Sequence, residues 1–272
     1  MEMSVAASTS LSTPSGPFVV GRPAEASGVE LSLILPTYKE AQNIGRSLEA
    51  ACEVLRAIPN LQFEVIVVDD NSPDGIAQIA IQAAARFPEV LVMCRKNESG
   101  LATAVIRGWQ AARGSILAVM DADMQHPPET LAQLVERMRG GCDLAVASRH
   151  VQGGGVGDWN LLRRIVSRGA QAIGLVILPE VLSRISDPMS GFFMVRRDSM
   201  VGVKLNPMGY KILIEVVARG RIRTIGEAGY VFCERTEGSS KATRAIYIQY
   251  IKHLLRLRLD LLRNFFSRGT QA

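Results

Sequence analysis

The sequence lacks any long uninterrupted hydrophobic run, although nearly half of its residues are hydrophobic. The 272 residues are 47% hydrophobic, with a mean hydropathy of +0.14. No stretch reaches the roughly 18 apolar residues that a membrane-spanning helix needs. The N-terminus has no basic region followed by an apolar run, so a signal peptide is not expected. Residues 1–28 are instead rich in Ser, Ala, Thr and Pro, which predicts a disordered tail.

Cysteine is scarce, and the common fingerprints of nucleotide-binding loops are missing. The four cysteines, Cys52, Cys94, Cys142 and Cys233, never stand in a C-x-x-C spacing. This scatter argues against a zinc site and suggests free thiols in a reducing compartment. The chain has neither GxxxxGK[ST] nor GxGxxG, so a bound nucleotide would need another scheme. No Ser/His/Asp or Cys/His spacing indicates a covalent nucleophile.

Acidic residues are nearly absent from the last segment, residues 241–272. It holds seven Lys or Arg but a single acid, Asp260, whereas the first 240 residues are close to neutral. Basicity confined to the tail argues against a nucleic-acid-binding protein and favours an anionic membrane surface. Because Lys252, Arg256 and Arg258 interrupt the apolar run, we expect amphipathic helices in the membrane interface. Docking on the domain or on a small membrane partner is the alternative.

What the sequence does contain is a regular alternation of apolar runs and amphipathic stretches between residues 29 and 240. The runs LSLIL, FEVIVV, VLVMC, SILAVM and DLAVAS predict buried parallel strands over 31–35, 63–68, 90–94, 115–120 and 143–148. Strand and helix in alternation predict an α/β fold, a mostly parallel sheet flanked by helices. The second half is less regular, with a helix around 211–219 and a short strand pair.

Polar motifs follow these strands directly, where ligands of open α/β sheets bind. DADMQ comes after the fourth strand and places Asp121 and Asp123 one residue apart. Two carboxylates this close repel each other unless a cation lies between them. With a further oxygen from Gln125 they could hold Mg²⁺ or Mn²⁺ and leave positions for a diphosphate. An ordinary solvated turn is the alternative.

The motifs after the first two strands have two interpretations each. In PTYKE, Thr37 and Glu40 fit a capping box at the start of the first helix. Alternatively, Tyr38 and Glu40 lie against a base or ribose. In DDNSPDG, one of Asp69 and Asp70 would contact the nucleotide while its neighbour caps the following loop.

A second group of candidate residues is basic and lies later in the chain. It comprises Arg149, Arg163, Arg164, Lys211, Arg235 and Lys241. Each alone is most simply a solvated surface charge, but several follow strands or stand beside Gly and Ser, where backbone amides also face anions. His126 and His150 are expected at the surface.

Together and in order, these motifs resemble the polyprenol-phosphate sugar transferases of glycosyltransferase family 2, most closely the dolichyl-phosphate mannosyltransferase branch. The resemblance rests on LPTYKEAQNI, VIVVDDNSPDG, GLATAV, DADMQHPPE, SRHVQGG, WNLLRRIVSRGA, SDPMSGFFMVRR, GYKILIEV and ERTEGSSK. It implies an A-type glycosyltransferase (Rossmann-like) fold for a catalytic domain over 29–240. It also implies GDP-mannose as donor and a dolichyl or polyprenyl phosphate as acceptor.

The resemblance further implies a role for each matching residue. The donor would contact Pro36, Tyr38, Glu40, Val67, Asp69, Asp121, Ala122, Asp123, Gln125, Arg149, Lys211, Arg235 and Lys241. The metal ligands would be Asp121, Asp123 and Gln125, and the acceptor phosphate would meet Arg149, Arg163 and Ser167. The catalytic residues would be Asp123, Arg149, Arg163 and Lys241.

The implied reaction is a direct displacement, because the acceptor phosphate is already anionic at neutral pH. Its oxygen can attack the anomeric carbon without a strong general base, which inverts that centre and gives a β-linked product. Such a protein would be peripheral on the cytoplasmic face of a membrane, with a small anchoring subunit as a candidate partner. Three alternatives stay open: UDP-glucose as donor, a non-catalytic nucleotide-sugar-binding subunit, and a haloacid-dehalogenase phosphatase, whose strand motif LAVMDADMQ also resembles.

Overall fold

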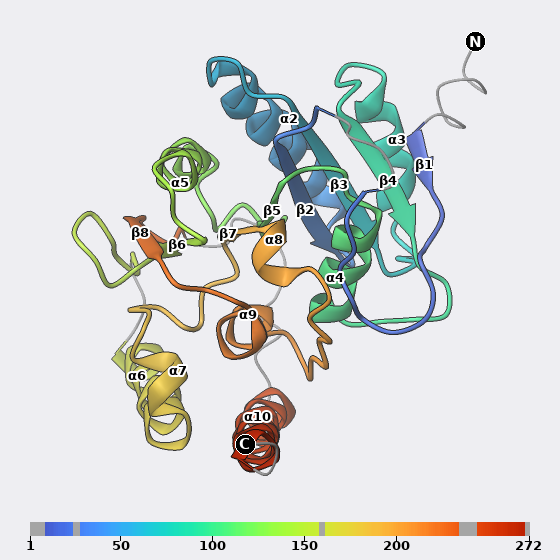
Figure 1. Ribbon diagram of the computed structural model, residues 1–272. Coiled ribbons are helices and arrows are strands. Elements are labelled where there is room, and N and C mark those ends of the chain that lie inside the picture. The colour runs from blue at the N-terminus through green and yellow to red at the C-terminus, as the bar shows by residue number, and fades with distance from the viewer. Residues whose placement is uncertain (1–8, 24–27, 158–160, 234–243, 270–272) are drawn as a thin grey trace.

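A computed structural model describes residues 9–23, 28–157, 161–233 and 244–269. In these residues the centre is one eight-stranded sheet with the strand order β1-β4-β3-β2-β5-β7-β6-β8 (Figure 1). The strands are β1 (Ser10–Leu11), β2 (Leu31–Thr37), β3 (Phe63–Asp69), β4 (Val90–Cys94), β5 (Ile116–Val119), β6 (Leu144–Ser148), β7 (Phe193–Arg196) and β8 (Ile225–Gly229). The five strands predicted from apolar runs are confirmed, and all five run parallel to one another.

Both faces of the sheet are buried, which explains why its strands are apolar at nearly every position. In β2, Leu33 and Leu35 point into one core while Ile34 points into the other. In β5, Ala118 and Val119 divide between the two cores in the same way. This period of two is the geometry of a strand, and it requires a helical layer on each face.

The helices form those two layers. On one face lie α2 (Ala41–Ala57), α3 (Ile76–Ala84) and α5 (Thr130–Arg139). The other face is covered by α4 (Leu101–Ala111), α8 (Arg197–Met200) and α9 (Ile212–Arg219). The remaining helices, α6 (Leu161–Ile177), α7 (Pro179–Leu182) and α10 (Arg244–Gly269), gather at the lower end of the molecule in Figure 1.

Strand β7 was not predicted, and it runs antiparallel between β5 and β6. Phe193 pairs with Val119 on one side and with Val146 on the other. Its apolar run is only a few residues long and directly follows the turn-like SDPMSG, so the hydrophobic pattern alone does not identify a strand. Because β7 is antiparallel, the loop that precedes it reaches the carboxyl ends of the parallel strands.

The prediction of a disordered tail over residues 1–28 is wrong for residues 9–23. Strand β1 pairs with β4, and Val20 is fully buried in the core. Apolar side chains in this Ser- and Pro-rich segment, Leu11, Phe18 and Val20, provide the packing that its average composition conceals. Residues 1–8 and 24–27 lie outside the described part of the chain.

Helix α10 has two apolar faces. Tyr250, His253, Leu254 and Leu257 are buried against the domain. A second row is exposed and follows helical spacing: Ile248, Ile251, Leu255, Leu259 and Leu262, which we call the outer stripe. Ile173 and Val176 on the contacting helix α6 are exposed too. Within the described residues, none of the helices combines the length and apolarity needed to cross a membrane.

Candidate active site at the carboxyl edge of the sheet

Three loops that follow parallel strands meet at one edge of the sheet and share an unusual backbone conformation. Lys39 after β2, Asn71 after β3 and Met124 after β5 have φ values of 56°, 52° and 60°. Non-glycine residues pay a conformational cost in this left-handed region, and such residues cluster at binding and catalytic sites. The edge predicted from the sequence is therefore also where backbone strain concentrates.

The PTYKE loop does not form the predicted capping box. Glu40 is itself the N-cap residue of α2 and makes no side-chain capping bond. The amide of Ala41 instead donates to Asp74 Oδ2 at 3.1 Å, so the cap comes from the neighbouring loop. Tyr38 is 45% exposed. A cleft of about 430 Å³ adjoins this loop, lined by Lys39, Glu40, Ala41, Gln42, Asn43 and Asp74.

Pro36 and Val67, the other predicted nucleoside contacts, are buried within β2 and β3. The two aspartates of DDNSPDG, at the end of β3, both accept hydrogen bonds from protein groups, and the nucleotide contact stays a prediction. Asp69 Oδ2 accepts the amide of Ser72 at 3.0 Å and caps the loop, and burial raises the pKa of Asp69.

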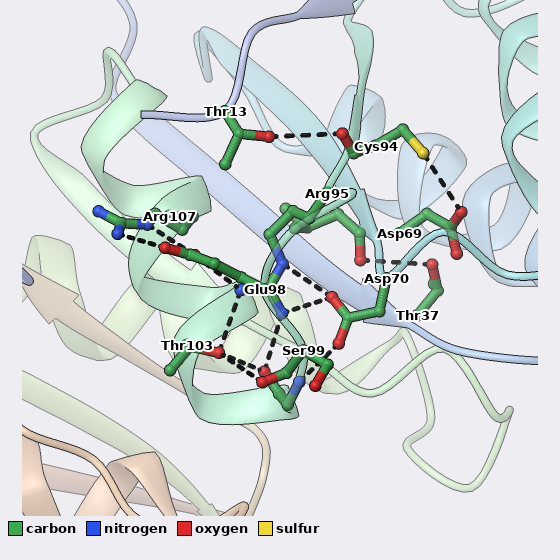
Figure 2. A network of polar contacts seen from close by, with 12 residues as sticks. Thr13, Thr37, Asp69, Asp70, Cys94, Arg95, Glu98, Ser99, Thr103 and Arg107 are labelled. Carbon is green, nitrogen blue, oxygen red and sulfur yellow. Dashed lines mark hydrogen bonds and ion pairs between the residues drawn. The ribbon is translucent and has the colours of Figure 1, made fainter. Parts of the chain in front are cut away.

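Asp70 holds the loop after β4. Its carboxylate accepts Arg95 Nε at 2.7 Å and the amide of Gly100, also at 2.7 Å (Figure 2). Asp70 was one of two candidates for the nucleotide contact, and in the structure its carboxylate binds Arg95, which follows β4.

DADMQ places its polar side chains at the centre of the edge. Asp123 and Gln125 are nearly buried, and the side chain of Asp121 is 30% exposed. The amide of Gln125 donates to Asp123 Oδ1 at 3.1 Å, and its Nε2 donates to the Cys233 carbonyl at 3.1 Å. The side-chain oxygen of Gln125 is therefore the atom that a metal could bind. Ala122 between the aspartates is buried, and its carbonyl accepts a hydrogen bond from Ser47 Oγ.

These residues fit a divalent cation whose remaining ligands come from a substrate. Among the described residues, no group of three or more His, Cys, Asp or Glu side chains could hold a metal by itself. Mg²⁺, however, is commonly bound through one or two carboxylates together with substrate phosphates. Gly191 keeps space beside the carboxylate, since a Cβ there would lie 2.7 Å from Asp121 Oδ2.

His126 is buried, so its predicted surface position is wrong, whereas His150 is exposed as predicted. The imidazole lies among the rings of Phe192, Tyr230 and Phe232, with centroid distances of 5.4, 5.6 and 5.6 Å. Burial lowers the pKa of His126 to about 4. The imidazole is therefore neutral at pH 7, and its Nδ1 lies 3.8 Å from Asp121 Oδ2.

Arg149 lies directly after β6 and forms a buried ion pair with Asp187. Arg149 Nε and Nη2 each donate to the carboxylate of Asp187 at 2.7 Å, and the Arg149 amide adds a third bond of 3.1 Å. Burial alone would raise the pKa of Asp187, but the hydrogen bonds and charge of Arg149 lower it. The sequence analysis assigned no role to Asp187, although it is an acid shortly before the apolar run FFMV in SDPMSGFFMV.

Lys211, just before α9, completes the basic side of the site. It is partly buried and donates to the carbonyl of Met189. Burial lowers the pKa of Lys211 to about 8, and the charge of Arg149 lowers it too, while Asp121 and Asp187 act in the opposite direction. The site therefore joins two basic groups to the aspartates of DADMQ.

The structure leaves five predicted residues without side-chain positions. Three of them belong to α6, but their side chains are not among those described: Arg163, Arg164 and Ser167. Arg235 and Lys241 lie outside the described residues. Their roles remain predictions.

The chain is similar to known proteins in both sequence and fold. The family model for glycosyl transferase family 2 matches residues 32–201. A dolichol-phosphate mannosyltransferase from Pyrococcus furiosus is 40% identical over 229 residues, covering 84% of this chain but only 64% of that protein. A dolichol-phosphate mannosyltransferase from Saccharomyces cerevisiae is 34% identical, covering 84% of this chain and 87% of the yeast protein.

Solved structures agree on the architecture. Glucosyl-3-phosphoglycerate synthase from Mycobacterium tuberculosis, in complex with Mn²⁺ and UDP, superposes with a TM-score of 0.65 at 20% identity, covering 90% of this chain and 86% of that one. Mannosyl-3-phosphoglycerate synthase from Rubrobacter xylanophilus gives 0.64 at 20% identity, covering 87% and 75%. The fold is that of the A-type glycosyltransferases. With the strand-end motifs in place and the family model matching over most of the sheet, the chain belongs to glycosyl transferase family 2.

Proposed function

We propose that this chain transfers mannose from GDP-mannose to dolichyl or polyprenyl phosphate, with inversion at the anomeric carbon and with Mg²⁺ or Mn²⁺ as cofactor. One observation carries the proposal: the carboxylates of DADMQ lie at the same edge of the sheet as a basic group, the buried Arg149 with the partly buried Lys211. An acidic group suits a metal-bound diphosphate, and a basic group suits a phosphate acceptor.

The donor side lies over the loops after β2, β3 and β5. The nucleoside would lie against Pro36, Tyr38, Glu40, Val67 and Asp69, beside the cleft that adjoins Glu40. Asp121, Asp123 and the Gln125 side-chain oxygen would hold the cation, with Ala122 close to the donor. The cation, when bound, neutralises the diphosphate and so stabilises the leaving GDP.

The acceptor side supplies positive charge in fixed positions. Asp187 fixes the guanidinium of Arg149 through two hydrogen bonds, so little reorganisation is needed when a phosphate arrives. Arg163 and Ser167 would meet the acceptor phosphate, while Lys211, Arg235 and Lys241 would contact the donor phosphates or the acceptor. The phosphate oxygen forms a bond to the anomeric carbon as the bond to the diphosphate breaks, and GDP leaves with the electron pair.

The acceptor's long chain stays in a bilayer, so the enzyme must reach it from the surface. The outer stripe of α10 and the basic residues beside it fit the interface of an anionic membrane. We infer a peripheral protein on the cytoplasmic face. Alternatively, a small membrane-anchoring subunit covers the outer stripe.

Two other functions make different predictions. UDP-glucose is a candidate donor because the M. tuberculosis synthase of similar fold was solved with UDP. A non-catalytic nucleotide-sugar-binding subunit would bind donor without turnover. A subunit that only binds the donor would not need the paired aspartates of DADMQ together with the buried Arg149–Asp187 ion pair.

The test is transfer of label into lipid. Purified protein is incubated with MgCl₂ or MnCl₂, polyprenyl phosphate and radiolabelled GDP-mannose, with radiolabelled UDP-glucose in a parallel reaction, and the lipid is extracted. We expect organic-phase label from GDP-mannose only. Label from UDP-glucose alone would show that UDP-glucose, and not GDP-mannose, is the donor. If neither donor gives label although the protein binds them, the chain is better explained as a non-catalytic binding subunit.

A further inference from the structure

Residues 9–23, here called the strap, precede the family match, which begins at residue 32. The strap starts as β1 on the outer edge of β4 and crosses the molecule to α8. At its far end Val20 is fully buried and bridges to Val201, and Arg197 donates to the Gly21 carbonyl at 2.9 Å. The strap is thus attached at both ends.

Residues 16–18, in the middle of the strap, bind side chains on one side of α4. Arg107 Nη2 donates to the Gly16 carbonyl at 3.0 Å, and the Arg107 guanidinium lies 4.4 Å from the ring centroid of Phe18. One turn along, Gln110 Nε2 donates to the Pro17 carbonyl at 2.8 Å. The aromatic face of Phe18 and the Gly16 carbonyl together fix where the Arg107 side chain lies, and Gln110 attaches the strap to α4 at a second point.

From Arg107 a chain of charged side chains leads to the site. Arg107 donates to both oxygens of Glu98, at 2.9 and 2.6 Å, and Arg95 contacts Glu98 at 3.4 Å (Figure 2). Arg95 in turn binds Asp70 and the Gly100 carbonyl. We call Arg107, Glu98, Arg95 and Asp70 the relay. It is neutral overall, and its arginines are almost fully buried.

The relay ends on the loops of the donor side. The Asp70 amide donates to the Thr37 carbonyl at 3.2 Å, and the Arg95 amide donates to the Asp69 carbonyl at 2.8 Å. Side chains of the relay therefore join the segments after β3 and β4, and backbone hydrogen bonds connect these segments to the end of β2. Buried ion pairs are weak contributors to stability compared with apolar packing, and their better supported use is to fix one arrangement.

We propose that the strap positions the donor side of the site through the relay, with Glu98 and Arg95 as positioning residues that do not touch the ligand. The identity of that ligand, a nucleoside diphosphate, rests on the proposed function. Loosening the relay should therefore raise KM for the donor and leave kcat close to its original value, because the metal and acceptor residues lie on other loops.

The first test is hydrogen exchange in the full-length protein. Glu98→Gln breaks the relay at its centre, and Phe18→Ala loosens the strap without changing a relay residue. Arg22→Ala is the matched control, because its ion pair with Asp198 lies on the strap but is exposed. We expect amides in 70–75 and 95–100 to exchange about tenfold faster in both variants. Their exchange rates should be unchanged in the control. Unchanged exchange in those segments, or a uniform rise over the whole sheet, would overturn the proposal.

The second readout is binding and turnover. With MnCl₂ present, Glu98→Gln and Phe18→Ala should weaken GDP binding about three- to tenfold and raise KM for the donor equally, with kcat within about twofold. A fall in kcat at unchanged GDP affinity would contradict a donor-positioning role. If the wild-type chain binds neither GDP nor UDP, the proposed function fails, and the exchange measurements still decide whether the strap controls these loops.

Discussion

The donor and acceptor sides of the site are built in contrasting ways. The donor side uses loops that follow parallel strands in chain order, held by contacts within a loop, such as Ser72 to Asp69, and by the relay between neighbouring loops. The acceptor side takes Arg149, Asp187 and Lys211 from separate elements, held by one buried ion pair. Parallel strands bring successive loops to one edge automatically, whereas the acceptor side depends on the antiparallel strand β7 and on helix packing. The difference predicts that single substitutions have distinct consequences on the two sides.

Removing a carboxylate from the donor side should have the largest effect on turnover. Asp123→Ala deletes a proposed metal ligand at a strand end without opening a core cavity, so transfer should fall at least about 100-fold while the folded state persists. Lipid-labelling rates and the thermal midpoint measure the two properties. Activity retained in this variant would refute the metal assignment.

Breaking the acceptor side should instead cost both turnover and stability. Asp187→Asn leaves Arg149 buried without its counter-ion, and removing one partner of such a pair typically costs about 3–5 kcal/mol. Denaturant unfolding checks the stability, and lipid labelling checks the activity. Asp198→Asn is the control, since its ion pair with Arg22 is exposed and should be nearly neutral. Equal stability of the two variants would show that the buried Arg149–Asp187 pair contributes no more than the exposed Arg22–Asp198 pair.

Gly191 connects the two sides, because it follows Asp187 in the same loop and leaves no room for a Cβ beside Asp121. In Gly191→Ala the new Cβ would lie 2.7 Å from Asp121 Oδ2, so the carboxylate must move. We expect about ten- to 100-fold slower transfer with a small change in stability. Gly169→Ala on α6, where a Cβ has open space, should leave transfer unchanged.

Glu215 on α9 makes a pH-dependent contribution to the free energy of unfolding. Burial alone would raise the pKa of Glu215, but hydrogen bonding to His253 and the charge of Arg219 lower it below the ordinary value of 4.5. Its contribution is therefore present above that value and is lost as pH falls through the lower folded-state pKa.

Glu215→Gln should consequently reduce the free energy of unfolding most at about pH 7, and the difference from wild type should shrink below about pH 4. Denaturant titrations at both pH values measure it. A difference that grows on acidification would show that the sign is wrong.

The outer stripe should affect membrane binding alone. Leu255→Gln with Leu259→Gln should weaken sedimentation with anionic vesicles about tenfold, while transfer to detergent-solubilised acceptor stays unchanged. Val231→Gln, at an exposed apolar residue away from α10, is the control. Full vesicle binding by the double variant would favour a protein partner for this stripe.

The contrast also explains how much could be predicted. The five parallel strands and the strand-end motifs follow from runs of Val, Ile and Leu that end in polar residues, as at Val119 before Asp121. Strand β7, the strap and the burial of His126 could not be predicted, because each depends on tertiary pairing rather than on local pattern. Asp187 could have been suspected from its position before an apolar run, but its partner Arg149 is 38 residues away.

The most direct test of the central claim is metal dependence of transfer in the wild-type protein. Chelation with EDTA should reduce organic-phase label from GDP-mannose to background, and excess Mg²⁺ or Mn²⁺ should restore it. A labelling rate that is unchanged by the chelator would contradict a site in which Asp121 and Asp123 bind the donor diphosphate through a cation.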